Sequence, residues 1–325
     1  MRERADISMN PQKESANPLT KNFAKKADLK ENNENPERTL EQTINYFSET
    51  PELSQSQFEK IAEFIQTNVG IKMPAQKKLM VQSRLQSRLK ALSLKNFDDY
   101  VDLVFAGGEK SEEEIALMIN VITTNLTNFF REKQHFDFMA EKALPALIQD
   151  GHKSIEIWSA GCSTGEEPYT LSIVMSEFMR KNPGKIADFS VLATDISSRV
   201  LEKAQNAVYP LESVGELPYE LKKRYFLKSK NPENPAVRLK PEIRQKVNFK
   251  RLNFMDSRYP VNGEKQIIFC RNVLIYFEKQ TQEEVIRKLI RHLVPGGYLF
   301  LGHSETIFGM DLPLRTVGST TFQKI

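Results

Sequence analysis

The sequence predicts an α/β fold in which a mostly parallel sheet is preceded by a small all-helical domain. In the second half of the chain, short strand-like segments alternate with helical segments, which is typical of β-α-β units. One of these segments, Gln266–Cys270, is almost continuously apolar, as a strand buried on both faces should be. Polar motifs follow several of these segments, and α/β sheets bind ligands at the carboxyl ends of their strands.

The composition sets limits on the class of protein. The chain has 325 residues, 40% of them hydrophobic and 27% charged, enough for one large and one smaller domain. Its net charge of +4 is too small to indicate nucleic acid. Apolar runs are too short for a bilayer span, and the first residues lack a secretory signal. Two cysteines cannot form a disulfide framework, and no Cys/His cluster has metal-ligand spacing. We therefore expect a reduced, cytoplasmic protein without a metal.

The chain divides by composition into three parts. Residues 1–52 are polar and predict a flexible tail with one transient helix near Thr39–Phe47. Residues 53–132 predict the helical domain and a linker, with Ser54 or Ser56 capping the first helix. Residues 133–325 predict the α/β domain.

A helix in the small domain carries a cationic face. Its segment QKKLMVQSRLQSRLKAL has a stripe of leucines, while Lys77, Arg84 and Arg88 lie on another face. Between Phe64 and Phe97 there are seven Lys/Arg residues and no acid. Such a face fits either an acidic partner or a solvated helix surface.

The remaining elements follow from apolar patterning and turn residues. The expected strands are Ser154–Ser159, Phe189–Thr194, Val247–Leu252, Gln266–Cys270 and, after a Pro-Gly-Gly turn, Tyr298–Gly302. The expected helices are Phe97–Phe105, Glu112–Val121, Lys133–Gln149, Leu171–Met179, Ser198–Ala207 and Gln282–Leu293.

The loop after the first strand, AGCSTGEEPYT, is built for close approach of a ligand. Its small residues let a ligand reach the backbone, and the next helix begins there with free N–H groups. It lacks both G-x-G-x-x-G and a phosphate-binding GK[ST]. Instead Glu166 and Glu167 stand at the entry, where carboxylates would repel phosphate and attract a cation such as S-adenosylmethionine. The alternative is that both residues only cap the helix.

Two further strands end in polar residues. Asp195 ends the second strand, where an acid can bind both hydroxyls of a ribose or cap the following helix. Arg271 and Asn272 follow the fourth strand, and buried polar groups of this kind need partners. Tyr276 lies on the next turn, where its hydroxyl could point into the site.

A polar segment, TTNLTNFFREKQHF, stands just before the α/β domain. Its threonines and asparagines are poor helix formers that supply short hydrogen-bonding side chains. Burial of Phe129 and Phe130 would fix the position of Arg131. The alternative for Arg131 is a surface salt bridge with Glu132 or a neighbour.

Four of these motifs, TTNLTNFFRE, WSAGCSTGEEPY, LATDIS and IFCRNVLIYF, occur in this order and together resemble the CheR family of chemotaxis receptor methyltransferases. The resemblance extends from about Ser54 to the C-terminus. It implies an S-adenosylmethionine-dependent methyltransferase (Rossmann-like) domain with a small inserted β-subdomain at about 208–250, preceded by an all-α domain. It also implies that the chain methylates glutamate side chains of chemoreceptor cytoplasmic helices.

The resemblance further implies roles for individual residues. Arg131 and Tyr276 match positions at the reaction centre. The residues that match cofactor-binding positions are Asn125, Thr127, Arg131, Glu166, Glu167, Asp195, Asn253, Phe254, Cys270, Arg271 and Asn272. Lys77, Arg84 and Arg88 would dock the receptor. A glutamate is already anionic near neutral pH, so alignment by Arg131 could replace a general base.

One segment departs from the family pattern. Some members grip a receptor's C-terminal peptide through a glycine-bearing turn, whereas the matching turn here, KSKNPENPAVRL, has no glycine. Positive φ is then less accessible, and we expect a member that needs no such tether. Two other classes stay open: a methyltransferase with a different acceptor, which the basic segment 222–251 would suit, and a cofactor-binding module without catalysis. The mechanism needs only a monomer, with no nucleic acid and no insertion into the membrane.

Overall fold

The computed structural model describes residues 51–325. The predicted helix near Thr39–Phe47 lies outside this range, as does the predicted tail apart from Pro51 and Glu52. The helices before the first strand are α2 (Gln55–Val69), α3 (Lys78–Leu92), α4 (Phe97–Phe105), α5 (Glu109–Ile122), α6 (Gln134–Phe138) and, after a π-helical turn at Met139–Ala143, α7 (Leu144–Gln149). None of the described helices is long and apolar enough to cross a membrane.

The helical part has its own core, and its first helix, α2, is capped at both ends. Ser54 caps α2: its hydroxyl accepts from Gln57 N at 3.2 Å, and the Gln57 side chain accepts from Ser54 N at 2.8 Å. Gly70, with φ of 79°, ends α2 in the left-handed conformation that glycine tolerates best. The core side chains come from α2 to α5 and include Phe58, Leu85 and Tyr100.

The α/β part contains a seven-stranded sheet with the order β6-β2-β1-β7-β8-β10-β9. Its strands are β1 (Ser154–Ala160), β2 (Asp188–Asp195), β6 (Val247–Arg251), β7 (Lys265–Cys270), β8 (Leu293–Leu301), β9 (Leu314–Gly318) and β10 (Thr321–Lys324). Neighbours from β6 to β8 pair in parallel, and β10 pairs antiparallel with both β8 and β9. The predicted α/β class with a mostly parallel sheet is confirmed.

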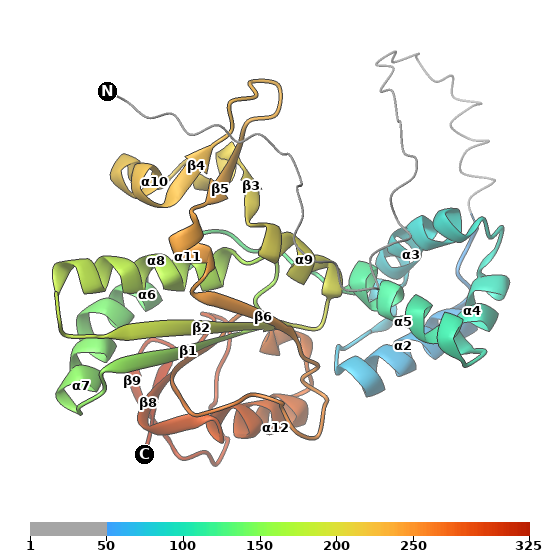
Figure 1. Cartoon of the computed structure of the whole chain (residues 1–325). Helices are drawn as coiled ribbons and strands as arrows, with labels where there is room; N and C mark the ends of the chain where they lie inside the picture. The colour runs from blue at the N-terminus through green and yellow to red at the C-terminus, as the bar shows by residue number, and fades with distance from the viewer. Residues whose placement is uncertain (1–50) are drawn as a thin grey trace. The chain divides into compact units, whose positions relative to one another are not determined.

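Helices cover both faces of this sheet (Figure 1). On one face α6, α7 and α8 (Glu166–Lys181) pack on β1 and β7 around residues such as Phe136, Leu171 and Phe269. On the other face α12 (Lys279–Ile290) packs against Trp158 and its neighbours. α9 (Ser198–Asn206) connects β2 to the small sheet.

A second, three-stranded sheet lies between α9 and β6 in the sequence. It contains β3 (Val208–Pro210), β4 (Phe226–Lys228) and β5 (Ala236–Leu239) in the order β3-β5-β4, with α10 (Tyr219–Tyr225) and α11 (Pro241–Arg244). It packs on α8 through Tyr169 and Ile173, and Figure 1 shows it standing over that helix. No residue of the turn 229–235 has positive φ, in keeping with its lack of glycine.

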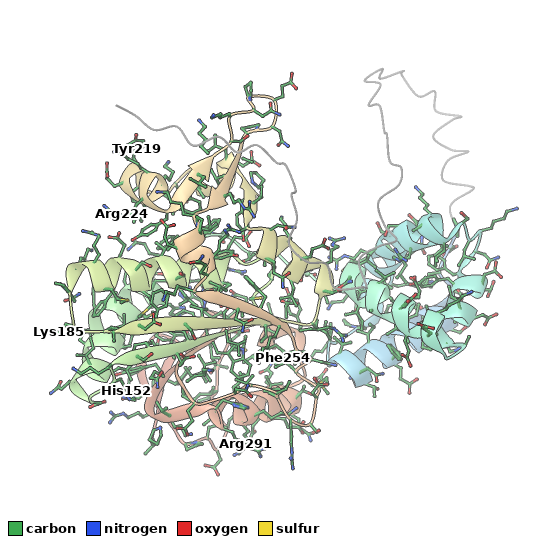
Figure 2. The ribbon with its side chains drawn as sticks, in the orientation of Figure 1. His152, Lys185, Tyr219, Arg224, Phe254 and Arg291 are labelled. Carbon is green, nitrogen blue, oxygen red and sulfur yellow. The ribbon has the colours of Figure 1, made fainter. Side chains whose placement is uncertain are left out.

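The carboxyl ends of the parallel strands lie together at one end of the sheet. In Figure 2, Phe254, which follows β6, lies at the opposite end of the strands from His152 and Lys185, which precede β1 and β2. The order of the strands reverses around β1, with β2 on one side and β7 on the other. Ligands of doubly wound sheets bind at this reversal, outside the carboxyl ends.

The sequence-based prediction of the last strand was wrong at its start. Pro295-Gly296-Gly297 was expected to form a turn, but it lies inside β8, which begins at Leu293. The pairing of β7 with β8 shifts register between Lys265 and Ile267, and Gly296 has φ of 76°. Glycine accommodates such a bulge, so the segment continues the strand.

Candidate active site

A pocket lies outside the carboxyl ends of β1, β2, β6 and β7, and residues from α2 to α5 and their connections line its opposite side. It gathers side chains from distant parts of the sequence. The predicted site residues among its lining are Lys77, Asn125, Thr127, Arg131, Glu167, Asp195, Asn253, Phe254, Arg271, Asn272 and Tyr276. Glu166, Cys270, Arg84 and Arg88 are not among the lining residues.

The loop after β1 forms the floor of the pocket without a side chain at Gly161. A Cβ there would lie 2.4 Å from Val273 Cγ2, and the residue has φ of 88°. The amides of Gly161 and Cys162 both donate to Thr194 O, at 2.8 and 2.9 Å, which ties this loop to β2. Only glycine fits at position 161, because the backbone is left-handed there and Val273, in the loop after β7, lies against it.

Asp195 holds the same loop from the end of β2. Its Oδ2 accepts from Ser163 N at 2.9 Å and its Oδ1 accepts from Ser197 N at 3.0 Å. Burial raises the pKa of Asp195, and the backbone donors at Ser197 and Ser163 act against that rise. The carboxylate reaches the pocket while it fixes the turn beside it.

The two adjacent glutamates at the start of α8 have different environments. Glu167 lines the pocket and its Oε2 accepts from Arg271 Nε at 2.8 Å, while its Oε1 accepts from Ser159 Oγ at 2.7 Å. Glu166 is buried and accepts from Thr164 Oγ1 at 2.6 Å, and burial raises its pKa. Successive helix residues point about 100° apart, so one faces the pocket and the other does not.

A network of charged and polar side chains holds the backbone of Arg131. Arg271 Nη1 donates to Arg131 O at 2.8 Å and lies 3.5 Å from Glu132 Oε2. Asn272 Nδ2 donates to Glu132 Oε1 at 3.1 Å. Burial acts to raise the pKa of Glu132, but the bond from Asn272 and the charge of Arg271 outweigh it and lower the pKa. Glu132 escaped notice in the sequence, where it appeared only as a possible surface partner of Arg131.

Arg131 and Tyr276 enter the pocket from different segments. Arg131 Nη1 donates to Leu126 O at 2.9 Å, across the polar segment that was identified in the sequence. Tyr276 ends a 3-10 turn, Leu274–Tyr276, and its carbonyl accepts from Lys72 N at 2.8 Å. No histidine is found among the residues that line the pocket, within the described part of the chain.

Asn253 and Phe254 close another part of the pocket. Asn253 Nδ2 donates to Asn68 O at 2.7 Å, which links the segment after β6 to the end of α2. Phe254 is nearly buried and its ring lies 6.1 Å from that of Phe277, edge to face. Together they give this part of the pocket an apolar wall with a polar edge.

The three cations expected to dock a receptor already have partners. Arg88 forms a two-bond pair with the buried Glu114, at 2.9 and 2.7 Å. Arg84 donates to the backbone carbonyl of Ile122 and to Thr124 Oγ1, at the end of α5. Lys77 donates to Lys72 O at 2.9 Å and lines the pocket, and burial lowers its pKa. A docking role for these residues stays a prediction.

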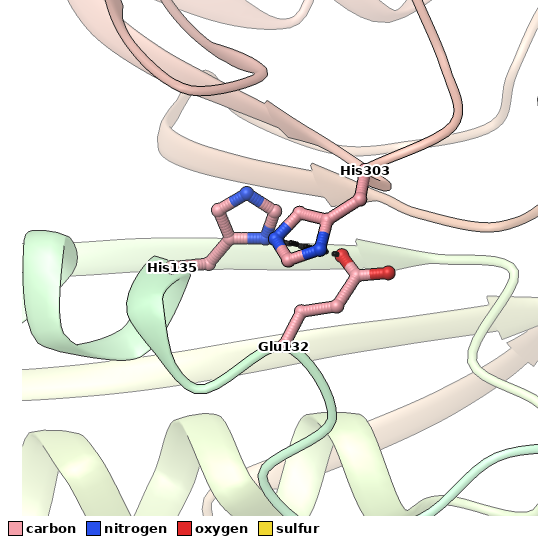
Figure 3. Close-up of side chains that lie close together, drawn as sticks. All are labelled: Glu132, His135 and His303. Carbon is pink, nitrogen blue, oxygen red and sulfur yellow. Dashed lines mark ion pairs between the residues drawn. The ribbon is translucent and has the colours of Figure 1, made fainter.

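Glu132, His135 and His303 form a cluster that sequence spacing did not reveal (Figure 3). Their ligand atoms lie within 4.8 Å of one another, close enough in principle for a metal ion. Arg271 Nη1, however, lies 3.1 Å from His135 Nδ1, so a cation already stands among these groups. A metal ion would have to displace this guanidinium, and the geometry favours a charge-paired network instead.

Comparison with known proteins shows which family the chain matches. The profile described as "CheR methyltransferase, SAM binding domain" matches residues 125–323, and "CheR methyltransferase, all-alpha domain" matches residues 56–123. The "Chemotaxis protein methyltransferase" of Borreliella burgdorferi is 38% identical over 286 residues, covering 86% of this chain and 98% of that protein. The protein of the same name from Salmonella typhimurium is 37% identical, covering 83% of this chain and 90% of that protein.

These matches define an S-adenosylmethionine-binding methyltransferase fold with an all-α N-terminal domain. The chain belongs to the CheR methyltransferase family. The pocket fits S-adenosylmethionine chemically: the carboxylates of Glu167 and Asp195 suit its cationic groups and ribose hydroxyls, and Phe254 offers an apolar surface for a base. Gly161 lines the pocket, and the absence of a side chain at this position leaves room for Val273.

Proposed function

We propose that this chain transfers a methyl group from S-adenosylmethionine to glutamate side chains of chemoreceptors, giving glutamate methyl esters and S-adenosylhomocysteine. The names of its relatives, chemotaxis protein methyltransferases, support the chemoreceptor as acceptor. S-adenosylmethionine supplies an electrophilic methyl group bonded to a sulfonium. A glutamate oxygen displaces the sulfur, so one C–O bond forms as one C–S bond breaks and no proton moves.

The observation that carries this proposal is a pocket with a cation and a tyrosine but without a histidine base. Arg131 lines it beside Tyr276, and a carboxylate acceptor needs alignment rather than deprotonation. Arg131 positions the acceptor carboxylate, and Tyr276 supports the geometry of transfer. Too tight a grip by Arg131 would stabilise the ground state, because charge is neutralised during the reaction.

The cofactor contacts in this proposal are those expected from the sequence. Glu167, with Glu166 beside it, faces the methionine part, Asp195 the ribose, and Asn253 and Phe254 the base. The remaining residues of the proposed cofactor site are Asn125, Thr127, Arg131, Cys270, Arg271 and Asn272, with Glu166 and Cys270 acting from behind the lining. No metal takes part.

We propose the domain division expected from the sequence, with a helical domain and linker at 53–132, a methyltransferase domain at 133–325 and an inserted β-subdomain at about 208–250. The protein works in the cytoplasm on receptor helices, without nucleic acid and without insertion into the membrane. All proposed site residues come from one chain, so a monomer suffices. The glycine-free turn 229–235 supports action without a receptor peptide tether.

The acceptor is tested by mass spectrometry after incubation with S-adenosylmethionine and purified receptor. Methyl groups on receptor glutamates support the proposal, whereas methylation of an added nucleic acid or small molecule, with the receptor unmodified, would replace it. Binding of the cofactor with no methylated product would indicate a silent binding module.

Docking by the cationic face needs a variant that keeps the fold. Reversing Arg88 alone would leave the buried Glu114, which also accepts from the Tyr100 hydroxyl, without its ion-pair partner and beside a second negative charge. The double variant Arg88→Gln with Glu114→Gln removes both charges together and leaves polar groups of similar shape. We expect a higher KM for receptor and an unchanged Kd for S-adenosylhomocysteine; an unchanged receptor KM would return Arg88 to a purely structural role.

A further inference from the structure

A buried carboxylate outside the pocket holds the loop that carries three of the predicted site residues. Glu305, 5% exposed, follows β8 and accepts four backbone N–H groups. Its Oε1 accepts from Val273 at 2.8 Å and Leu274 at 2.7 Å, and its Oε2 accepts from Asn272 at 3.0 Å and Gly302 at 2.6 Å. Glu305 is not among the site residues expected from the sequence.

The loop needs such an acceptor because its turn buries consecutive amides. Asn272 has φ of 57°, a left-handed conformation that asparagine adopts more readily than most residues other than glycine. The turn directs consecutive amides of Asn272, Val273 and Leu274 into the protein, and buried N–H groups require partners. A single carboxylate satisfies all three and thereby stabilises the conformation of the turn.

The same loop shapes the pocket. Arg271, Asn272 and Tyr276 line it, and Val273 lies against the position where Gly161 lacks a side chain. There is little space for the loop to adopt another position. A Cβ on Gly302 would lie 2.6 Å from Asn272 Nδ2 and 3.0 Å from Glu305 Oε2.

We propose that Glu305 is a positioning residue for methyl transfer: its carboxylate fixes the backbone of residues 272–274 and thereby the pocket positions of Arg271, Asn272 and Tyr276. That Glu305 holds the loop is inferred from its hydrogen bonds alone, whereas its effect on methyl transfer also rests on the proposed function. Burial raises the pKa of Glu305, opposed by the four backbone donors.

The test is Glu305→Gln, which keeps the shape but places an amide NH₂ where two backbone N–H groups need an acceptor. Glu177→Gln is the matched control: Glu177 also accepts from several donors, namely Arg180, Arg224 and Tyr225, but lies outside the pocket lining. Gly302→Ala disturbs the same contact and serves if Glu305→Gln does not fold. Hydrogen exchange, thermal unfolding and the Kd for S-adenosylhomocysteine are measured on the full chain.

We expect faster exchange of the amides at 272–274 in Glu305→Gln and a Kd raised roughly tenfold or more, since bonds to a charged acceptor are strong. Glu177→Gln should bind normally even when its thermal stability falls equally. Unchanged exchange or an unchanged Kd in Glu305→Gln would overturn the proposal, as would an equal loss of binding in Glu177→Gln. If the wild type failed to bind, the proposed cofactor would be wrong, and the exchange rates would still decide whether Glu305 holds the loop.

Discussion

Arg271 Nε lies 2.8 Å from Glu167 Oε2, with side chains only 1% and 11% exposed, and this pair joins the end of β7 to the start of α8 beneath the pocket. The same guanidinium donates to Arg131 O and lies 3.1 Å from His135 Nδ1. One buried cation therefore sets the position of groups from two separate segments, α8 and residues 131–135. Four predictions follow from the surroundings of this pair and of the pocket.

Arg271→Met should destabilise the fold and not only weaken binding. It leaves the buried Glu167 with the Ser159 hydroxyl as a donor but without its ion-pair partner, and breaking a buried ion pair costs about 3–5 kcal/mol. The control is Lys133→Met, which removes an exposed pair with Asp137 and should cost less than about 1 kcal/mol. Urea denaturation measures both. Similar small losses would mean that solvent can balance the Glu167 charge and that the buried pair contributes little to stability.

Gly161→Ala should abolish cofactor binding. The new Cβ would lie 2.4 Å from Val273 Cγ2, so the Val273 side chain or the loop after β7 must shift at the pocket. Gly184→Ala is matched for backbone strain, with φ of 76°, but has no atom within 4 Å of its Cβ position. It should cost only about 1 kcal/mol of stability. Calorimetric titration with S-adenosylhomocysteine distinguishes the two, and normal binding by Gly161→Ala would exclude this loop from the site.

Arg131→Ala should mainly lower turnover. Its guanidinium aligns the acceptor, and misplacement of a reacting group can cost about 10²-fold in rate. The Kd for S-adenosylhomocysteine should change less than kcat, because Arg131 also stands at a position expected to bind the cofactor, and Arg131→Lys should recover part of the rate through its charge. Steady-state kinetics with receptor measure kcat and KM separately. Full turnover in Arg131→Ala would remove the role that we propose for it.

The fold should lose stability in mild acid because His135 is buried in its neutral form. Burial, and then the charge of Arg271, lowers its pKa from 6.5 to about 4, with Glu132 acting in the opposite direction. Below pH 6.5 the unfolded chain takes up a proton that the folded chain refuses until about pH 4. Stability therefore falls as pH drops through this window, by roughly 3 kcal/mol from this group.

The control for this pH dependence is His135→Gln, because His292 also has a pKa lowered by burial and contributes in the same direction. The difference between wild type and variant isolates His135. Urea denaturation between pH 7 and pH 4 should give a flatter profile for the variant. Parallel profiles would show that His135 does not titrate as proposed.

The buried strands and the polar residues at their ends were predictable because the local pattern of apolar and polar residues determines both. Gln266–Cys270 was predicted as a strand from its apolar run, and β7 spans Lys265–Cys270. Asp195 and Arg271 stand where strand ends predicted polar groups, and both line the pocket. Strands β9 and β10 were not predicted, since both are short and gain their partners only in the sheet, and β9 is also half-exposed.

Contacts made across long sequence separations could not be predicted. Glu305 meets the amides of residues 272–274 only after β7 and β8 pair, and nothing near it in sequence marks it as a loop-holding group. The pairing of Arg88 with Glu114 likewise depends on how α3 and α5 pack. Glu166 and Glu167 looked equivalent in the sequence, and the helix turned them in different directions.

The central claim is methyl ester formation on a chemoreceptor. The most direct measurement is incubation with methyl-labelled S-adenosylmethionine and receptor-containing membranes, followed by treatment with base. We expect label on the receptor that base releases as methanol, because carboxyl methyl esters hydrolyse and methylated amines or ethers do not. Label that stays on the receptor after base, or none on it although the cofactor binds, would contradict the account.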